Sequence, residues 1–421
     1  LVPARAHELF PCFDQPDLKA GFSLTLVLPD DWEAVANAPE RQRRLEMGAD
    51  GRQRLVVSFD DTDPLPTYLF AFAAGPFAIE TAFRAGRMLR MFHREPDEAR
   101  VARNRRAIVD QHMAALDWLE QYTGMPYPFA KLDIVLVPAF QFGGMEHPGA
   151  IFYNAASLLL EASPTRQQEL ARAHLVAHET AHMWFGNLVT MTWFGDVWMK
   201  EVFANVMAAR IVEPAFGDVE HDLRFLLTHY PGAYDVDRTA GSHPIRQTLE
   251  DLADAGSLYG ALIYLKSPIV LRQLERRLGT TGLRDALREY LRRFAFSNAA
   301  WPDLVAILAE REASAPVPPD GRDPARDIRA FCHDWIDAAG RPALEVSDVA
   351  SGSRPRVRVA RAPRQALDAA PDGPRWPQQL EVAFGFGGEV DHVSCAWTGE
   401  AIEVESPRQA TPDFVLPNGR G

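Results

Sequence analysis

The sequence predicts an α+β chain of several domains, in which a helical middle part lies between two β-rich ends. Short runs at both ends alternate apolar and polar residues with the period of two that a half-buried strand requires. Between about Ala99 and Gly340, apolar residues instead recur at helical spacing. The length of 421 residues is enough for two to four domains and a buried core.

The first β-rich segment covers residues 1–82. Residues 22–30 (FSLTLVLPD) and 52–60 (RQRLVVSFD) each predict one strand, because they are rich in alternating apolar and β-branched residues. Residues 64–83 (PLPTYLFAFAAGPFAIETAF) predict two buried strands that are broken at Gly75-Pro76.

The middle segment predicts a series of amphipathic helices. The helix at residues 101–124 ends at a glycine, and the helix at residues 167–187 is stopped by Gly186-Asn187. Residues 131–140 (KLDIVLVPAF) are too short and too β-branched for a helix and predict a strand. Further helices are expected at residues 197–217, 263–279, 282–295 and 327–340, with a Pro/Asp-rich loop at residues 315–327.

The last segment, from Arg341, predicts a small β-sandwich. Short strands separated by loops rich in Pro, Gly and Asp are typical of that architecture. The expected strands are residues 342–349, 354–362, 378–388 and 393–405.

Composition and charge exclude some classes of protein. The formal net charge of −13 disfavours nucleic-acid binding, which needs a basic face. No apolar run is long enough to span a bilayer, and Cys12, Cys332 and Cys395 are expected to be free thiols. Because the chain does not begin with Met, we expect a fragment or a processed form, and the compartment, cytoplasmic or exported, stays open.

Residues His178, Glu179 and His182 form an H-E-x-x-H motif within a predicted helix. The two histidines are one turn apart on the same face, so both imidazoles can bind one Zn²⁺. Glu179 lies beside that line, where it can accept a proton from a metal-bound water as a general base. The motif is short, however, and histidines on such a helix are often structural.

A zinc site for catalysis needs a third protein ligand, and Glu201 on the following predicted helix is the candidate. Eighteen residues separate it from His182, which is long enough for the chain to turn back. His174 is a rival ligand on the same helix face as His182. Two helical turns place it about 12 Å from His182, so we expect it to be a neighbour that does not bind the ion.

A second motif follows the strand at residues 131–140, in the sequence QFGGMEHPGAIFY. Gly143 and Gly144 permit close backbone approach, and Met145 is expected in the core. Glu146 follows this glycine turn and could bind a substrate ammonium group if it faces the zinc site. A strand edge here could pair with an extended peptide. The alternative is an ordinary polar turn that carries a surface glutamate.

The two motifs together resemble the joint signature of the aminopeptidase N family of zinc metallopeptidases, G-x-M-E-N followed by H-E-x-x-H-x18-E. That family also includes leukotriene hydrolase. The segments FPCFDQPDLKA, MWFGNLVTM and PDFVLPNGRG are similar to further segments of the family, so the resemblance extends over nearly the whole chain.

The resemblance implies three parts: an incomplete N-terminal β domain (residues 1–82), a thermolysin-like zinc catalytic domain (residues 83–342) and a β-sandwich (residues 343–421). It implies one zinc ion per chain, held by His178, His182 and Glu201. Glu179 would be the catalytic base and acid.

The resemblance also implies how a substrate binds. Residues Gly143, Gly144, Met145 and Glu146 would bind the peptide, with the carboxylate of Glu146 on its free N-terminal amine. The family's Y-x-K-G segment corresponds to the run from Tyr264 to Ser267, so Tyr264 would stabilise the oxyanion as the second catalytic residue.

Five positions depart from the family pattern. Val2 stands ten residues before the cysteine of F-P-C, where the family usually has Gln or Glu as a second group for the amine. His147 stands where asparagine is usual, and Ser267 replaces a glycine, with Pro268 after it. Lys200 and Val202 flank Glu201 where Asn and Gly are common, which indicates changes in local packing.

The function expected from these residues is zinc-dependent removal of the N-terminal residue from peptides. A zinc endopeptidase and an epoxide hydrolase could use the same metal site. A non-catalytic scaffold that keeps the fold, or an unrelated α+β protein with a chance H-E-x-x-H, would explain fewer of the residues.

Overall fold

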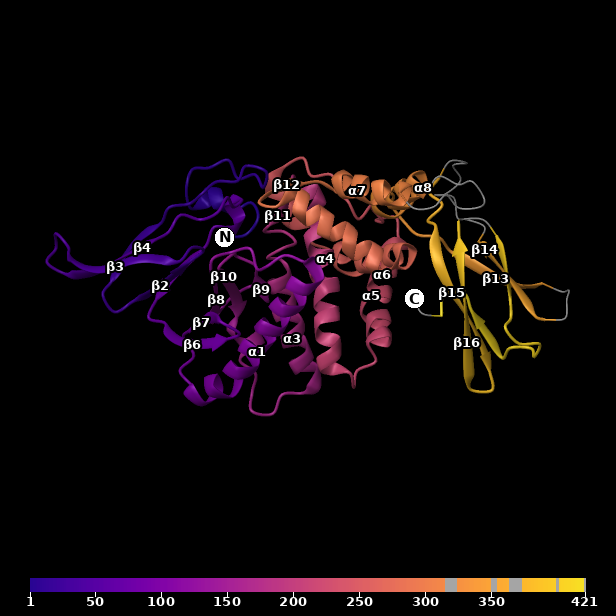
Figure 1. The fold of residues 1–421 in the computed structure, drawn as a ribbon, viewed down its shortest axis with the longest axis horizontal. Coiled ribbons are helices and arrows are strands. Elements are labelled where there is room, and N and C mark those ends of the chain that lie inside the picture. The colour runs from indigo at the N-terminus through magenta and orange to yellow at the C-terminus, as the bar shows by residue number, and fades with distance from the viewer. Residues whose placement is uncertain (315–323, 350–353, 363–372, 399–400, 420–421) are drawn as a thin grey trace. The chain divides into compact units, whose positions relative to one another are not determined.

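The structure is a computed structural model that describes residues 1–314, 324–349, 354–362, 373–398 and 401–419 (Figure 1). It contains two compact units. The first comprises Leu1–Val219, Leu249–Leu258 and Leu287–Trp301, and the second comprises Glu220–Thr248, Tyr259–Ala286 and Pro302–Gly421. The α+β class is confirmed, whereas the domain limits after residues 82 and 342 stay predictions.

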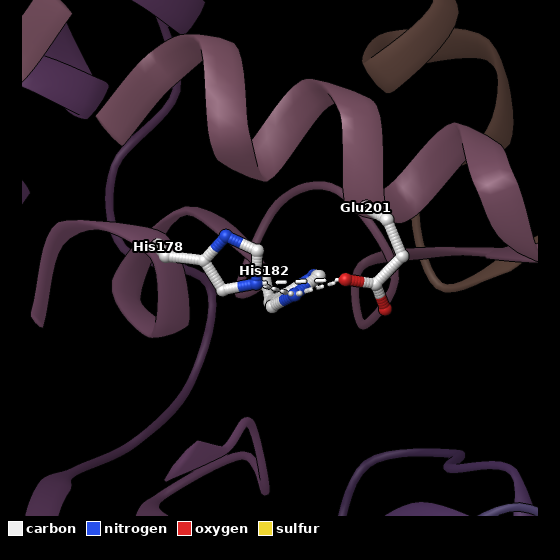
Figure 2. A group of neighbouring side chains, drawn as sticks. All are labelled: His178, His182 and Glu201. Carbon is white, nitrogen blue, oxygen red and sulfur yellow. Dashed lines mark hydrogen bonds and ion pairs between the residues drawn. The ribbon is translucent and has the colours of Figure 1, made fainter. Parts of the chain in front are cut away.

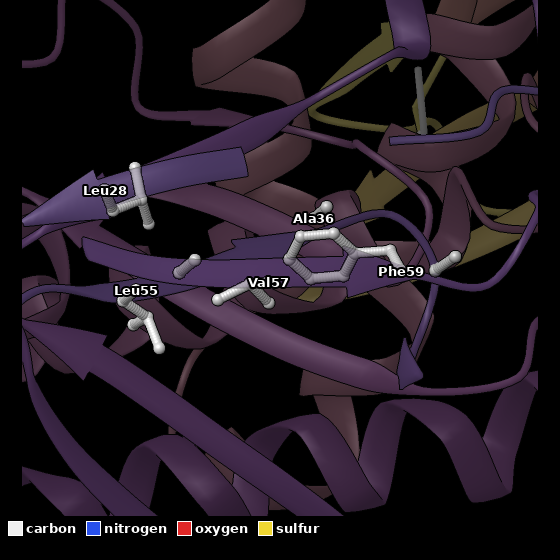
Figure 3. Close-up of a cluster of buried hydrophobic side chains, with 7 residues drawn as sticks. Leu28, Ala36, Leu55, Val57 and Phe59 are labelled. Carbon is white, nitrogen blue, oxygen red and sulfur yellow. The ribbon is translucent and has the colours of Figure 1, made fainter. Parts of the chain in front are cut away.

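The first unit opens with small antiparallel sheets. Their strands are β1 (Thr25–Pro29), β2 (Glu33–Ala36), β3 (Glu40–Met47), β4 (Gln53–Phe59) and β5 (Phe72–Gly75). One sheet has the order β1-β4-β3, and β2 pairs with β5. Leu28, Val57 and Phe59 belong to the apolar cluster that these strands bury (Figure 3). The strands predicted at residues 22–30 and 52–60 are therefore confirmed as β1 and β4.

A mixed five-stranded sheet follows in the first unit. Its strands are β6 (Ala78–Arg84), β7 (Arg87–His93), β8 (Leu132–Val137), β9 (Gly144–Met145) and β10 (Ala150–Asn154). The order is β6-β7-β8-β10-β9, with parallel pairing inside and antiparallel strands at both edges. The strand predicted at residues 131–140 is β8. The prediction that both strands within residues 64–83 are buried is wrong for β6, because this edge strand leaves most of its side chains exposed.

Four helices accompany this sheet: α1 (Glu98–Thr123), α2 (Ala155–Leu158), α3 (Arg166–Ala181) and α4 (Val197–Val212). Helix α1 ends as predicted, because Gly124 adopts a left-handed conformation with φ of 68°. Helix α3 contacts α1, α4 and β9, so it lies at the centre of the unit. A short parallel pair joins β11 (Val189–Met191) to β12 (Ser297–Ala299).

The predicted extent of the helix at residues 167–187 is wrong at its C-terminal end, because α3 stops at Ala181. The amides of Met183 and Trp184 bond to carbonyls three residues back, which tightens the chain into turns. Gly186, with φ of 124°, then reverses the chain. His182 is therefore the residue that caps the helix rather than a residue in its interior.

The helices of the remaining chain include α5 (His221–Asp237), η5 (Leu252–Leu258), a π-helix η6 (Leu262–Lys266), α6 (Ser267–Phe294), α7 (Trp301–Ala313), α8 (Pro324–Cys332) and a second π-helix η7 (His333–Asp337). The helices predicted at residues 263–279 and 282–295 follow one another within η6 and α6, with a break at Gly279. The predicted loop covers residues 315–327, of which residues 315–323 lie outside the described residues. Its last four residues are helical and begin α8.

The predicted sandwich is confirmed as two three-stranded antiparallel sheets in the second unit, with orders β13-β14-β17 and β16-β15-β18. Its strands are β13 (Leu344–Val349), β14 (Arg356–Arg361), β15 (Gln378–Phe386), β16 (Glu389–Trp397), β17 (Ile402–Glu405) and β18 (Phe414–Leu416). Val357 and Val404 from one sheet and Leu380 and Trp397 from the other form its core.

Two further observations concern the whole of the described chain. The three cysteines are free thiols in the structure. Among the described helices, none combines the length and the apolar character needed to cross a bilayer.

Candidate metal centre and its neighbours

Two helices of the first unit place three potential metal ligands together. His178 lies in the last turn of α3, His182 caps the same helix, and Glu201 lies in the second turn of α4. Figure 2 shows the two imidazole rings and the carboxylate pointing toward one another. The Nε2 atoms of the histidines lie 3.1 Å apart. The Oε2 atom of Glu201 lies 3.5 Å from Nε2 of His178 and 3.9 Å from Nε2 of His182.

Small side chains let these helices approach each other. Ala173 and Ala177 on α3 and Ala208 on α4 belong to one buried cluster that is completed by Leu170 and Val212. Alanine keeps the helical backbone favourable and occupies little space between two axes. The start of α3 is fixed by a capping box between Thr165 and Gln168. The histidines are therefore held on a well-defined helix and not on a loop.

The donor set fits a zinc ion. The Nδ1 atom of His182 lies 3.0 Å from the carbonyl oxygen of Phe185, so this nitrogen carries the proton and Nε2 presents its lone pair. Burial lowers the pKa of His182 to about 4, which keeps the ring neutral as a ligand must be. Two imidazole nitrogens and one carboxylate oxygen are a ligand combination that catalytic zinc sites use.

The other two potential ligands, His178 and Glu201, form an ion pair. Burial alone would lower the pKa of His178, but the neighbouring Glu201 carboxylate outweighs it and raises that pKa. Burial opposes ionisation of Glu201 as well, yet Lys200 and the two histidines hold its pKa well below the usual range. The carboxylates of this site therefore favour a positively charged group beside them.

Glu179 lies beside this group and faces the backbone of β9. Its side chain is 4% exposed, and burial raises its pKa to about 8. A Cβ atom on Gly144 would lie 2.4 Å from Oε1 of Glu179. Any side chain at Gly144 would therefore displace the carboxylate, which explains why this position needs glycine.

Glu146 is buried in the same place, so the alternative interpretation as a surface glutamate is wrong. Its carboxylate has an oxygen within 4.8 Å of ligand atoms of both Glu179 and His182. The ammonium of Lys200 donates to its Oε1 at 2.6 Å, and the side chain of Asn187 donates to its backbone carbonyl at 2.6 Å. Burial disfavours its ionised form, but Lys200 and then His182 outweigh that effect and lower the pKa of Glu146 to about 2.

The segment that carries Glu146 lies at the edge of the five-stranded sheet. Strand β9 pairs with β10 on one side, with Met145 opposite Phe152 and Gly144 opposite Tyr153. Met145 is buried, as expected for a core residue. As the last strand in the sheet order, β9 has its other side free to pair with an extended chain.

His147, which departs from the family pattern, is buried next to the first residue of the chain. Its Nε2 atom lies 2.7 Å from the carbonyl oxygen of Leu1, to which it donates a hydrogen bond. Burial lowers the pKa of His147 to about 3, so the ring is neutral at physiological pH.

Two further residues, His174 and Tyr264, were considered from the sequence. His174 is half-buried on α3 and does not belong to the groups of potential ligands found among the described residues. Tyr264 lies in η6 of the second unit, half-buried, with its ring 6.4 Å from that of Tyr259. Its role stays a prediction.

Sequence reasoning missed the part that Lys200 takes in the site. We interpreted Lys200 only as a change in local packing, but its ammonium contacts both Glu146 and Glu201. A signal was present: Lys200 lies in a helical segment that is mostly apolar, and a lysine in such a segment must find carboxylate partners when it is buried.

Comparisons with known proteins add to this geometry. The sequence matches the peptidase family M1 domain over residues 108–335 and the peptidase M1 N-terminal domain over residues 2–69. It is 30% identical over 384 residues to the puromycin-sensitive aminopeptidase of Caenorhabditis elegans, which covers 90% of this chain and 38% of that protein.

Two further relatives come from an archaeon and a plant. The chain is 30% identical to the leucyl aminopeptidase of Saccharolobus solfataricus, with 83% of this chain and 42% of that protein covered. It is 33% identical to aminopeptidase M1-B of Oryza sativa, with 81% of this chain and 37% of that protein covered. The chain thus spans about two fifths of the length of these relatives.

Proposed function

The chain belongs to peptidase family M1, and from this premise we propose that it carries the active site of a zinc-dependent aminopeptidase. The observation that carries the proposal is the convergence of His178, His182 and Glu201, with two further buried carboxylates beside them. A metal site alone would fit many hydrolases. The additional acid, Glu146, can bind the charged N-terminal end of a peptide and would thereby orient the substrate.

We propose that Nε2 of His178, Nε2 of His182 and Oε2 of Glu201 hold one zinc ion. When bound, zinc lowers the pKa of a coordinated water toward neutrality and polarises the scissile carbonyl. The protein keeps His182 and Glu201 buried and His178 half-buried on two packed helices, which supports a fixed geometry in a site of low dielectric constant.

Glu179 is proposed to move the proton. Its carboxylate takes a proton from the attacking water and delivers it to the leaving amine, as general base and then general acid. The raised pKa of about 8 supports the role, because burial makes Glu179 a better proton acceptor than an exposed glutamate. The backbone of Gly144 packs against this carboxylate and limits its movement.

Glu146 is proposed to bind the substrate's N-terminal ammonium, which restricts cleavage to the first peptide bond. Its low pKa keeps the carboxylate ionised over the physiological range. Gly143 directly precedes the edge strand β9, which Gly144 and Met145 form, and the peptide backbone would add there as a further strand. The amine anchor and the strand edge together position the scissile carbonyl.

Tyr264 is proposed to donate a hydrogen bond to the developing oxyanion. This role rests on the correspondence of the run from Tyr264 to Ser267 with the Y-x-K-G segment of the aminopeptidase N family.

A pair of matched substrates tests the proposal. An aminoacyl fluorogenic peptide and its N-acetylated twin are assayed with and without a zinc chelator. We expect hydrolysis of the free-amine substrate only, and loss of that hydrolysis with the chelator. Equal cleavage of the twin would indicate an endopeptidase, and no cleavage by zinc-loaded protein would contradict a peptidase function.

A further inference from the structure

Lys200 joins the two halves of the candidate site. Its Nζ atom lies 2.6 Å from Oε1 of Glu146 and 2.6 Å from Oε1 of Glu201. The two carboxylates come from different elements, the β9–β10 turn and helix α4, and the lysine side chain is only 6% exposed. One buried ammonium therefore fixes the distance between the proposed amine anchor and a proposed metal ligand.

The lysine takes one oxygen of Glu201 and leaves the other to the histidines. Lys200 contacts Oε1, whereas Oε2 is the atom that lies 3.5 Å from His178. A carboxylate that is held in this way presents a single oxygen to a metal in a fixed direction. On Glu146, too, the oxygen that accepts from Lys200 is Oε1.

The position of Lys200 is itself well determined. A Cβ atom built on Gly186 would lie 3.2 Å from both Cβ and Cδ of Lys200, so the aliphatic part of the lysine packs against the turn after α3. The ammonium also lies 6.0 Å from the ring centre of Tyr68. The turn after α3 therefore confines the aliphatic part of Lys200, and two carboxylates fix its ammonium.

Lys200 is shared by two carboxylates, and Glu201 has His178 as a second partner at 3.5 Å. Resting on the proposed aminopeptidase function, we infer that Lys200 is a positioning residue that aligns Glu146 for the substrate's ammonium and Glu201 for the metal. Through Glu146, it sets how strongly the enzyme prefers a free N-terminal amine.

The first test replaces Lys200 by a neutral side chain of similar length, in Lys200→Met. We expect KM for a free-amine substrate to rise by about five- to tenfold, with kcat changed less than threefold, because the anchor is misaligned and the reacting groups remain. The preference over the N-acetylated twin should fall by the same factor. Lys200→Arg, which keeps the charge, should recover most of the preference.

The metal side of the inference has its own measurement. In chelator competition, Lys200→Met should bind zinc about 10- to 100-fold more weakly, since a partner of a ligand has been removed. Arg172→Met is the matched control, because Arg172 is a buried cation on α3 whose hydrogen bonds go to Asn104 and Leu158. This variant should keep the zinc affinity and the KM of the parent.

A double-mutant cycle separates positioning from a merely structural role. In a Glu146→Gln background, Lys200→Met should change KM less than threefold, because the residue through which it acts is already gone. Additive effects on KM would overturn the inference. If the Met variant does not fold, Lys200→Gln replaces it. If neither folds while Lys200→Arg folds, the lysine is structural and the inference fails.

The outcomes distinguish this inference from the proposed function. If the zinc-loaded parent protein does not hydrolyse the free-amine substrate, the proposed function itself is wrong. If the parent hydrolyses it with the expected preference and the cycle is additive, only the role of Lys200 is wrong.

Discussion

Two buried lysines, one in each unit, have different partners, and only one of them contacts the proposed site. Lys266 of the second unit lies 2.8 Å from Oδ2 of Asp237 and donates to the carbonyl of Gly340 at 2.7 Å. Its charge is balanced by one carboxylate. Lys200 of the first unit is shared by Glu146 and Glu201, and a third buried carboxylate, Glu179, lies nearby.

The comparison teaches how differently the two lysines are used. Lys266 pairs with one carboxylate and donates to one carbonyl, so these contacts hold η6 to its neighbours. Lys200 joins two carboxylates, and burial raises the pKa of the third acid, Glu179, to about 8. Several strongly shifted pKa values in one buried group are typical of functional sites.

The largest effect is expected for Glu179→Gln. Loss of the proton acceptor should lower kcat by about 10²- to 10⁴-fold, while zinc content stays at the parent level. Because burial raises the pKa of Glu179 to about 8, a neutral side chain should also raise the Tm of the metal-free protein. Kinetics, metal analysis and thermal unfolding check the three parts. An active variant would remove Glu179 from the mechanism.

In the ion pair of Lys266 and Asp237, loss of the carboxylate is expected to lower stability rather than raise it. Asp237→Asn leaves the Lys266 ammonium buried without its counter-charge, which should lower the free energy of unfolding by about 3 kcal/mol in urea. Asp222→Asn is the matched control, because Asp222 is exposed in its ion pair with Arg272 and should change stability by less than about 1 kcal/mol. Equal losses in the two variants would break the comparison.

A smaller effect is expected for Glu146→Gln. Loss of the carboxylate should raise KM for free-amine substrates by about tenfold, which is the loss of one charge-assisted hydrogen bond. Glu95→Gln, at an ion pair with Arg100, serves as a control that should leave KM unchanged. If KM and the preference over acetylated peptides both stay at the parent values, Glu146 does not bind the amine.

The smallest effect concerns a buried group with no charge partner. His112 is fully buried, contacts the hydroxyl of Tyr153 and the carbonyl of Ile108, and burial lowers its pKa to about 4. In the unfolded chain the imidazole of His112 binds a proton near pH 6.5, whereas in the folded protein it stays neutral down to about pH 4. The contribution of His112 to the free energy of unfolding is therefore fully present above pH 6.5 and is lost as the pH decreases toward 4.

Between pH 7.5 and pH 5.5, His112 should account for a loss of about 1 kcal/mol in the free energy of unfolding. His112→Gln should remove this share, which is measured as a shallower dependence of stability on pH than in the parent. The same dependence of stability on pH in both proteins would show that the folded protein binds a proton at His112 as readily as the unfolded chain does.

The sequence predicted the elements that have a clear pattern. Helix α1 and its end at Gly124 follow from amphipathic spacing and a glycine cap, and the sandwich strands follow from alternation. Strand β3 was missed because nearly all its side chains are exposed and its charged sequence has no apolar face. Strand β10 was missed because five residues in a parallel sheet give too short a signal.

The candidate site was predictable where the ligands lie close in sequence. The spacing of His178 and His182 on a helix predicts that they meet, and Glu201 follows from the distance to the next helix. The contact of Gly144 with Glu179 and the bridge through Lys200 were not predictable from spacing. Both depend on how the edge strand β9 approaches the helix pair, which is a matter of tertiary packing.

The metal content of the purified protein tests the central claim most directly. We expect one zinc ion per chain, and less than about one tenth of that in Glu201→Ala, because a carboxylate ligand has been removed. Glu169→Ala, at the other end of α3, should keep one zinc ion. A zinc-free parent protein, or a Glu201→Ala variant that retains the full amount, would contradict the account.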